Sequence, residues 1–227
     1  SRKEVRDHIF DAITAVLDQG PIDYVKWDMN RSMADVDGGR LSYDYVLGVY
    51  AFLERLTARY PEMLIEGCSG GGGRYDAGML YYTPQIWCSD NTDAINRTRI
   101  QYGTSFFYPV SSMGAHVSAV PNHQTGRVTS LHTRGVVAMA GTFGYELNPA
   151  LLTAEEKAEI RAQIGCFKQY EQLICEGTYW RLASPYTDAV SAWMMVSAQQ
   201  DRALVSAPPF LSRFTIYGTR ATMSTVN

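Results

Sequence analysis

A helical pattern gives way to a short β-rich run within residues 20–28, GPIDYVKWD. Gly20 and Pro21 end the preceding helix, because glycine favours the position just past a helix and proline cannot continue one. The run from Ile22 to Asp28 then places alternate side chains on opposite faces, as a strand does. Lys26 and Asp28 share one face and lie toward its carboxyl end, so this strand is predicted to end in a polar edge.

The same alternation of helix and strand continues along the chain. Periodicity predicts strands at 22–28, 63–68, 85–89, 116–120 and 142–147, and helices at 2–18, from Ser42 to Pro61, and at 94–104, 128–140 and 154–175. Strands separated by helices of this length form parallel βαβ units. The pattern predicts an α/β fold, and periodicity alone does not choose between an open sheet and a barrel.

The C-terminal part has a different pattern. The segment from Tyr186 to Val205 is strand-like without a helical period, and the chain becomes irregular from Ala207. We therefore expect one domain over residues 1–183 and the start of a separate β domain with an irregular tail over 184–227.

Composition narrows the possible classes of protein. The 227 residues carry a formal net charge of −3, and 46% of them are hydrophobic, as in a globular domain with one sizeable core. A nearly neutral chain gives no electrostatic basis for binding nucleic acid or an anionic membrane, and no apolar run is long enough to span a bilayer. The four cysteines form no C-x-x-C pair and the four histidines show no metal-ligand spacing, so we expect a cytoplasmic protein without a metal or cofactor.

Two aspartates follow predicted strands. Asp28 ends the first strand, where an ion pair with Lys26 is the plain structural alternative to a catalytic role. Asp93 is explained as the N-cap of the helix that begins at Ala94, whereas Asp90 lies too early to cap that helix. Two carboxylates at strand ends are what glycoside cleavage needs, because one attacks the anomeric carbon and the other transfers a proton.

The four glycines at 70–73 fit neither the G-x-x-x-x-G-K-[ST] nor the G-x-G-x-x-G pattern, so a nucleotide site is not expected. They would let backbone N–H groups approach a ligand, or they form a flexible connection. Cys68 before them is by default a small buried hydrophobic residue. Trp87 suits the apolar face of a sugar ring, although core packing explains it equally well.

Four motifs occur in one order along the chain: KWDMNR at 26–31, CSGGGGRYD at 68–76, WCSDNTD at 87–93 and MGAHVS at 113–118. Together they resemble the α-galactosidases of glycoside hydrolase family 36, over residues 1 to about 205. The resemblance implies a (β/α)8 TIM-type barrel followed by a β-sandwich, of which this chain would hold about strands 4 to 8 and the start of the sandwich. The first three strands of the barrel would be absent.

The resemblance also implies an activity and a site. It implies a glycosidase of carbohydrate metabolism that hydrolyses terminal α-linked galactose, as in melibiose and raffinose, with retention of configuration through a galactosyl-enzyme intermediate. The catalytic residues implied are Asp28 as nucleophile and Asp90 as acid/base. The implied substrate-binding residues are Lys26, Asn30, Cys68, Gly70 and Gly71, and we add Trp87. The partner would be an α-galactoside oligosaccharide, and a homo-oligomer is expected.

Three alternatives stay open. The first is an α-N-acetylgalactosaminidase, which Cys68 and the glycines disfavour because an N-acetyl group would need room there. The second is a galactosyl transferase of the raffinose synthase kind. The third is a truncated, non-catalytic fragment.

Overall fold

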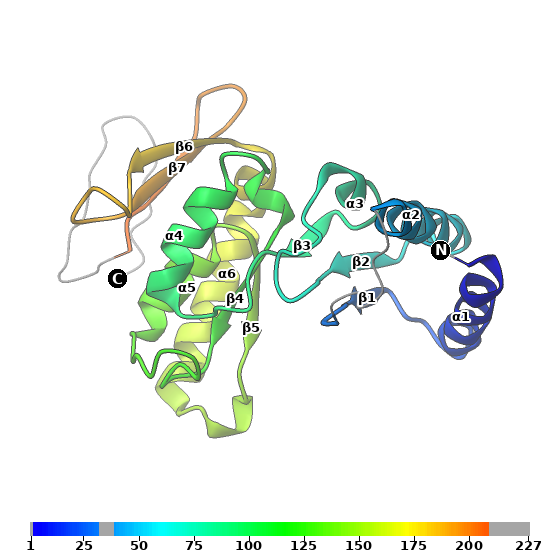
Figure 1. The fold of residues 1–227 in the computed structure, drawn as a ribbon. Helices are drawn as coiled ribbons and strands as arrows, with labels where there is room; N and C mark the ends of the chain where they lie inside the picture. Colours follow the sequence, from blue (N-terminus) through cyan, green and yellow to red (C-terminus); the bar gives the residue numbers. More distant parts are fainter. Residues whose placement is uncertain (1, 32–38, 209–227) are drawn as a thin grey trace. The chain divides into compact units, whose positions relative to one another are not determined.

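The computed structural model describes residues 2–31 and 39–208, which belong to two compact units, Ser1–Trp87 and Cys88–Asn227 (Figure 1). Most of the tail expected from Ala207 onward lies outside the described residues.

The first unit alternates helices and strands as its sequence predicts. Its elements are α1 (Lys3–Leu17), β1 (Tyr24–Trp27), α2 (Arg40–Arg59), β2 (Leu64–Gly67), α3 (Ala77–Tyr82) and β3 (Gln85–Trp87). The three strands pair in parallel in the order β1, β2, β3. The short helix α3 was not predicted, and Asp76 begins it by accepting a hydrogen bond from the backbone N–H of Met79 at 2.8 Å.

One face of this parallel sheet carries the hydrophobic core of the unit. Ile65 of β2 and Ile86 of β3 are buried there against Leu53 and Leu56 of α2. Trp27 of β1 packs on the same cluster, with its ring centroid 5.1 Å from that of Phe52. The opposite face therefore remains for the polar side chains of the three strands.

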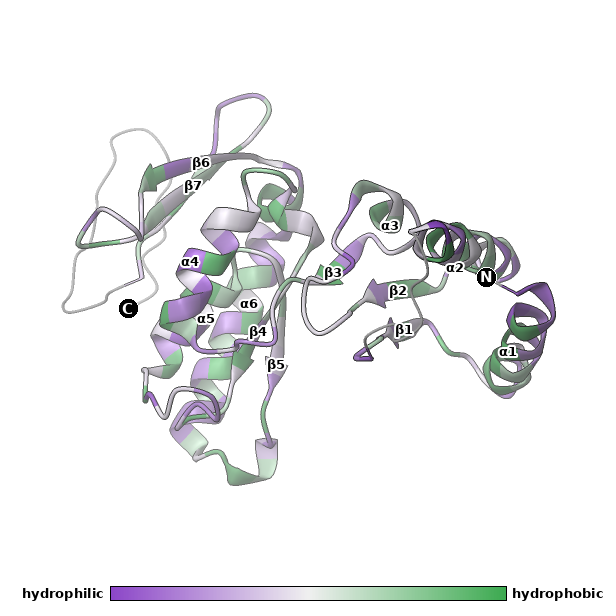
Figure 2. Ribbon diagram, in the orientation of Figure 1, coloured by the Kyte–Doolittle hydropathy of each residue, from purple (hydrophilic) through white to green (hydrophobic). Residues whose placement is uncertain are grey.

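Helix α1 has the amphipathic pattern that its sequence predicts (Figure 2). Phe10, Ile13 and Leu17 pack on the core, whereas Val5 and Ile9 are exposed among the described residues. The helical period was thus predicted correctly, while the described residues bury only part of the apolar stripe.

The second unit begins with two further βα repeats. Its elements here are α4 (Ala94–Thr104), η1 (Val110–Ser112), β4 (Met113–Ser118), α5 (Leu131–Ala138), β5 (Thr142–Glu146), η2 (Pro149–Leu151) and α6 (Ala154–Glu176). Strands β4 and β5 pair in parallel (Figure 1). Val117 of β4 is buried with Leu131 and Ala138 of α5. Helix α6 begins with a capping box of Thr153 and Glu156.

The unit continues into a three-stranded antiparallel sheet of β6 (Thr178–Ala183), β7 (Ala192–Val196) and β8 (Ala203–Ser206). β7 lies within the segment predicted to be strand-like, and β8 ends one residue beyond it. β6 begins directly after α6 and Gly177, eight residues before the predicted start at Tyr186, so that expected start was wrong. The α/β class with parallel strands is confirmed in both units. No helix among the described residues has the length and apolar character needed to cross a bilayer.

Candidate active site

The polar face of the first sheet is built by alternation along β1. Tyr24 and Lys26 point to the face opposite the core, while Trp27 packs on the core. Backbone pairing then aligns Lys26 with Glu66 of β2, and Glu66 with Gln85 of β3. Three polar side chains from three strands therefore form one row across the sheet.

Glu66 is the centre of this row and has no exposed surface (0%). Its Oε2 accepts hydrogen bonds from the Tyr24 hydroxyl and, at 2.5 Å, from Gln85 Nε2. Its Oε1 lies 3.7 Å from Lys26 Nζ. Burial, followed by the hydrogen bond to Glu66, raises the pKa of Tyr24, so this phenol stays a donor.

Glu66 was not among the predicted site residues. A signal for it was present, because it is the one charged residue in the otherwise apolar run from Met63 to Gly67. A carboxylate in a buried strand needs partners, and its partners come from strands that only the fold brings next to it.

Among the described residues, the ion pair of Lys26 is with Glu66, not with Asp28 as the structural alternative supposed. Its ammonium group lies between Glu66 and the ring of Trp87, with Nζ 4.6 Å from the ring centroid. Trp87 is buried (4% exposed). A cation over an indole face is favourable, so Trp87 stabilises the ammonium group of Lys26 through a cation–π contact. Trp87 is also a buried core residue.

Asp28 follows β1 and is exposed, with its carboxylate held by neighbours. Asn30 Nδ2 donates to its Oδ2 at 2.6 Å. Partial burial raises the pKa of Asp28, but hydrogen bonds from the Cys68 thiol, from Asn30 and from the backbone of Met29 lower it, as does the charge of Lys26. The pKa of Asp28 is below its ordinary value in consequence, and the side chain is ionised at neutral pH.

Cys68 is the buried residue at the end of β2 (3% exposed). Burial raises the pKa of its thiol to about 11, so the thiol stays protonated at neutral pH. The S–H group donates a hydrogen bond to Asp28. The backbone fixes this pairing, because Cys68 N–H donates to Trp27 O at 2.9 Å and Met29 N–H donates to Cys68 O at 3.2 Å. The strand end that carries Asp28 is thereby tied to the strand end that carries Cys68.

The glycine loop after Cys68 is bound to the same segment. Gly70 N–H donates to Asn30 Oδ1 at 2.8 Å, and Ser69 Oγ donates to Met29 O at 2.9 Å. Gly70 and Gly71 have φ of +51° and +80°, a region that residues with a Cβ rarely adopt. The loop therefore has a defined conformation that needs glycine, with Asn30 bridging the loop and Asp28.

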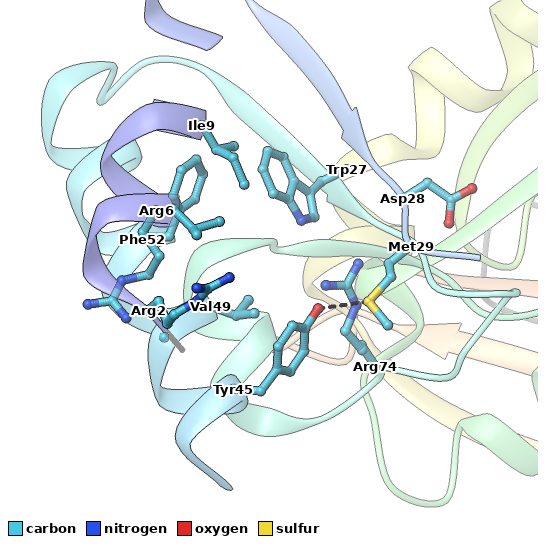
Figure 3. Close-up of a pocket in the computed structure, with 12 residues that line it drawn as sticks. Arg2, Arg6, Ile9, Trp27, Asp28, Met29, Tyr45, Val49, Phe52 and Arg74 are labelled. Atoms are coloured by element: carbon cyan, nitrogen blue, oxygen red, sulfur yellow. Dashed lines mark hydrogen bonds between the residues drawn. The ribbon is translucent and has the colours of Figure 1, made fainter. Parts of the chain in front are cut away.

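A pocket of about 440 Å³ also touches Asp28 in this unit (Figure 3). It lies mainly between α1, α2 and the core side of β1, with Trp27, Met29 and Phe52 among its lining residues. Figure 3 shows the Asp28 carboxylate pointing away from Trp27 and Phe52. This pocket is therefore separate from the polar face that carries Lys26 and Glu66.

Asp90 belongs to the second unit, at an exposed bend before α4. Asp93 is the N-cap of α4, as predicted, and accepts from Asn96 N–H at 2.9 Å. Arg97 of α4 is buried and donates to Ser89 O at 3.1 Å. The bend that carries Asp90 is thus held at both of its ends.

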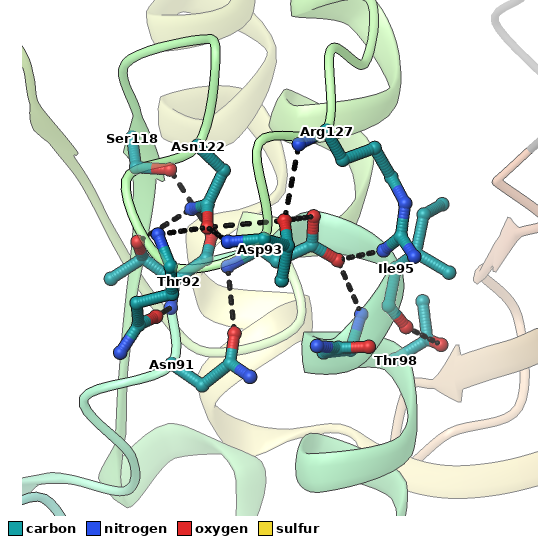
Figure 4. A network of polar contacts seen from close by, with 11 residues as sticks. Asn91, Thr92, Asp93, Ile95, Thr98, Ser118, Asn122 and Arg127 are labelled. Atoms are coloured by element: carbon teal, nitrogen blue, oxygen red, sulfur yellow. Dashed lines mark hydrogen bonds and ion pairs between the residues drawn. The ribbon is translucent and has the colours of Figure 1, made fainter.

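Asp93 is also the centre of a buried polar network (Figure 4). Its side chain, 1% exposed, forms an ion pair with Arg127 and accepts a hydrogen bond from Thr125 Oγ1 at 2.9 Å. Asn122 Nδ2 donates to Thr92 Oγ1 at 3.0 Å, and Ser118 Oγ donates to Thr92 O at 3.1 Å. The network ties the 89–93 segment to the loop that follows β4.

The predicted site residues thus fall into two groups. Lys26, Asp28, Asn30, Cys68, Gly70, Gly71 and Trp87 lie in the first unit around the carboxyl ends of β1, β2 and β3. Asp90 lies in the second unit. Their roles toward a substrate remain predictions.

Similar proteins are known. A family model described as Melibiase matches residues 1–177. The chain is 80% identical over 206 residues to the bifunctional alpha-galactosidase/sucrose kinase AgaSK of Mediterraneibacter gnavus, which covers 91% of this chain and 22% of that protein. It is 52% identical over 214 residues to alpha-galactosidase AgaA of Geobacillus stearothermophilus, which covers 91% of this chain and 29% of that protein.

Solved structures are similar to the chain as well. The galactosidase domain of AgaSK has a TM-score of 0.91 at 72% identity, covering 100% of this chain and 31% of that one. A variant of GH36 α-galactosidase AgaA in complex with raffinose has a TM-score of 0.86 at 51% identity, covering 91% of this chain and 30% of that one. This chain therefore spans between about a fifth and a third of the length of these relatives. With more than half of its residues matched by the family model, the chain belongs to the melibiase family, GH36.

Proposed function

We propose that this chain carries the catalytic residues of a retaining α-galactosidase, a glycoside hydrolase that removes terminal α-linked galactose. The observation that carries the proposal is the state of Asp28. It lies at the carboxyl end of a parallel strand, where sites of α/β folds form, and its pKa is lowered by Cys68, Asn30 and Lys26 against the effect of burial. An ionised, oriented carboxylate is what attack on an anomeric carbon requires.

In the proposed reaction, Asp28 attacks the anomeric carbon of galactose and forms a galactosyl-enzyme ester. Asp90 protonates the departing glycosidic oxygen in that step. Asp90 then removes a proton from water, which attacks the anomeric carbon of the intermediate, displaces the Asp28 carboxylate and releases galactose with its original configuration. This mechanism requires the two carboxyl groups to lie roughly 5–5.5 Å apart in the active enzyme.

The other residues of the first unit are proposed to bind the sugar. Lys26 and Asn30 would hold galactose hydroxyl groups, and Asn30 already contacts both Asp28 and Gly70. Cys68, Gly70 and Gly71 would form one side of the sugar pocket. The two glycines would let the backbone of the loop come close to the sugar, because they have no side chains. Trp87 would act mainly by supporting Lys26.

The proposed substrates are α-1,6-galactosides of the melibiose and raffinose type. Solved structures of AgaA variants hold raffinose and stachyose, which supports this class. We further propose that the barrel strands here correspond to strands 4 to 8 of a (β/α)8 barrel, that residues 184–227 begin a β-sandwich domain, and that the enzyme is a cytoplasmic homo-oligomer.

The test compares Asp28→Ala with Asp23→Ala, an exposed aspartate just before the same strand. Each is placed in the full chain, and also in AgaSK with this chain replacing the matching segment. Hydrolysis of an aryl α-galactoside should be lost in Asp28→Ala and retained in Asp23→Ala. If the parent AgaSK hybrid is active and its Asp28→Ala version is equally active, the assignment of the nucleophile is wrong.

A further inference from the structure

We propose that Glu66 is a positioning residue for sugar binding, holding the ammonium group of Lys26 in place at the site. This inference rests on the proposed function, because it concerns how Lys26 meets a galactose hydroxyl. It starts from a carboxylate that the proposed reaction does not use.

Glu66 is in an unusual position for an acidic side chain. It is completely buried in the middle of a parallel sheet, and removing a carboxylate from water is costly unless it is paired and hydrogen-bonded. Its two oxygens are treated differently. Oε2 accepts from Tyr24 and Gln85, whereas Oε1 accepts no hydrogen bond from the described residues and faces Lys26 Nζ at 3.7 Å.

These contacts fix Glu66 before Lys26 is considered. Tyr24 and Gln85 come from the strands on either side of β2, and both donate hydrogen bonds to Oε2. A carboxylate anchored through one oxygen presents the other in a set direction. Because Lys26 lies directly beside Glu66 in the strand register, the negative charge is aimed at its ammonium group.

Lys26 is held but not enclosed. Its ammonium lies between Glu66 and the Trp87 ring, yet 42% of its side chain is exposed. An ammonium group has three N–H donors, and the contact with Glu66 occupies one side of it. The donors on the open side remain for hydroxyl groups of a ligand.

Lys26 lies close enough to Asp28 for both residues to contact the same sugar. The two residues lie on the same face, two positions apart, which is roughly 7 Å along a strand. The charge of Lys26 also contributes to the lowered pKa of Asp28. A flexible lysine side chain loses conformational freedom when it binds a sugar, and Glu66 removes part of that freedom beforehand.

The experiment is a double-mutant cycle of Glu66→Gln and Lys26→Met, in the full chain and in the AgaSK hybrid described above. Glutamine has nearly the volume of glutamate and keeps an acceptor for Tyr24, but it removes the charge. Glu62→Gln, an exposed glutamate just before β2, is the matched control. The readouts are the Kd for D-galactose, and KM and kcat for an aryl α-galactoside.

We expect Glu66→Gln to raise the Kd and KM about tenfold, the effect of weakening one hydrogen bond from a charged group, with kcat changed less than about threefold. In the Lys26→Met background, the same change should alter the Kd less than about twofold, because Glu66 acts through Lys26. Glu62→Gln should leave all three values unchanged. Equal effects of Glu66→Gln with and without Lys26 would overturn the inference.

Failure of the proposed function is distinguishable from failure of this inference. If the parent proteins neither bind galactose nor turn over the substrate, the proposed function fails. The cycle is then measured on unfolding of the ligand-free chain in urea. If the changes in the free energy of unfolding caused by the two substitutions are non-additive, they support an interaction between Glu66 and Lys26. If the changes are additive, they overturn it.

Discussion

Asp90 and Asp93 are three residues apart in the sequence. The structure predicts that removing Asp93 lowers the free energy of unfolding much more than removing Asp90. Asp93→Ala should destabilise the second unit by about 3 kcal/mol. Loss of the N-cap of α4 costs about 1 kcal/mol, and loss of the hydrogen bond from Thr125 to a buried carboxylate costs roughly 1.5 kcal/mol. The ion pair with Arg127 adds less than about 1 kcal/mol, because the Arg127 side chain is 41% exposed.

Asp93→Asn separates these contributions. Asparagine also caps helices, so this variant should keep the α4 cap and lose roughly 1–2 kcal/mol through the weaker contacts with Thr125 and Arg127. The Asp90→Ala variant should change the free energy of unfolding by less than about 1 kcal/mol, since Asp90 is exposed. Glu171→Ala on the surface of α6 is the control for a generic loss of charge.

The assay is urea denaturation followed by far-UV circular dichroism, with hydrogen exchange of the α4 amides as a local measure. A loss of about 3 kcal/mol corresponds to a fall in Tm of roughly 6–12 °C for a chain of this length. Equal stability of Asp93→Ala and Glu171→Ala would refute the account of the network. So would an Asp93→Asn variant as unstable as Asp93→Ala, because the cap would then contribute nothing.

Three further predictions concern the site. Asn30→Ala should move the acidic limb of kcat/KM to higher pH, because it removes one of the hydrogen bonds that lower the pKa of Asp28; an unchanged pH profile would contradict that contribution. Because the pKa of Asp28 is lower in the folded chain than in the unfolded chain, its contribution to the free energy of unfolding is present above the unfolded pKa and is lost as the pH falls through the folded pKa. Gly71→Ala should cost about 1–2 kcal/mol and raise KM, because its φ of +80° strains any residue with a Cβ; a melting curve like that of the parent would show the loop to be adaptable. Asp90→Ala should slow hydrolysis of raffinose at least roughly 100-fold, yet slow the first step for an aryl galactoside with a good leaving group much less; equal losses on both substrates would argue against a role as general acid.

Much of the local structure could be predicted from the sequence. The bounds of α4 and its cap at Asp93 follow from one polar residue before a helical pattern, and the capping box of Thr153 and Glu156 is equally local. Strand β1 was predicted to run over 22–28 and is observed at Tyr24–Trp27, with the expected division into two faces. These features depend on neighbours within a few residues.

Features that depend on distant residues were missed or misplaced. Helix α3 has six residues, too few to show a helical period, and its cap Asp76 also accepts from Tyr50 of α2. The start of the antiparallel sheet was placed at Tyr186, because the strand character of β6 is clear only from its pairing with β7. Glu66 was not selected as a site residue because its partners come from two other strands.

In the proposed reaction, Asp28 is the residue that forms a bond to galactose. The most direct measurement uses a fluorinated α-galactosyl substrate that forms the ester faster than it hydrolyses, followed by proteolysis and mass spectrometry of the AgaSK hybrid carrying this chain. A fluorogalactosyl mass increment is expected on the peptide that contains Asp28 and should be absent from the Asp28→Ala hybrid. An increment on any other carboxylate, or rapid inactivation-free turnover with inverted product, would contradict it.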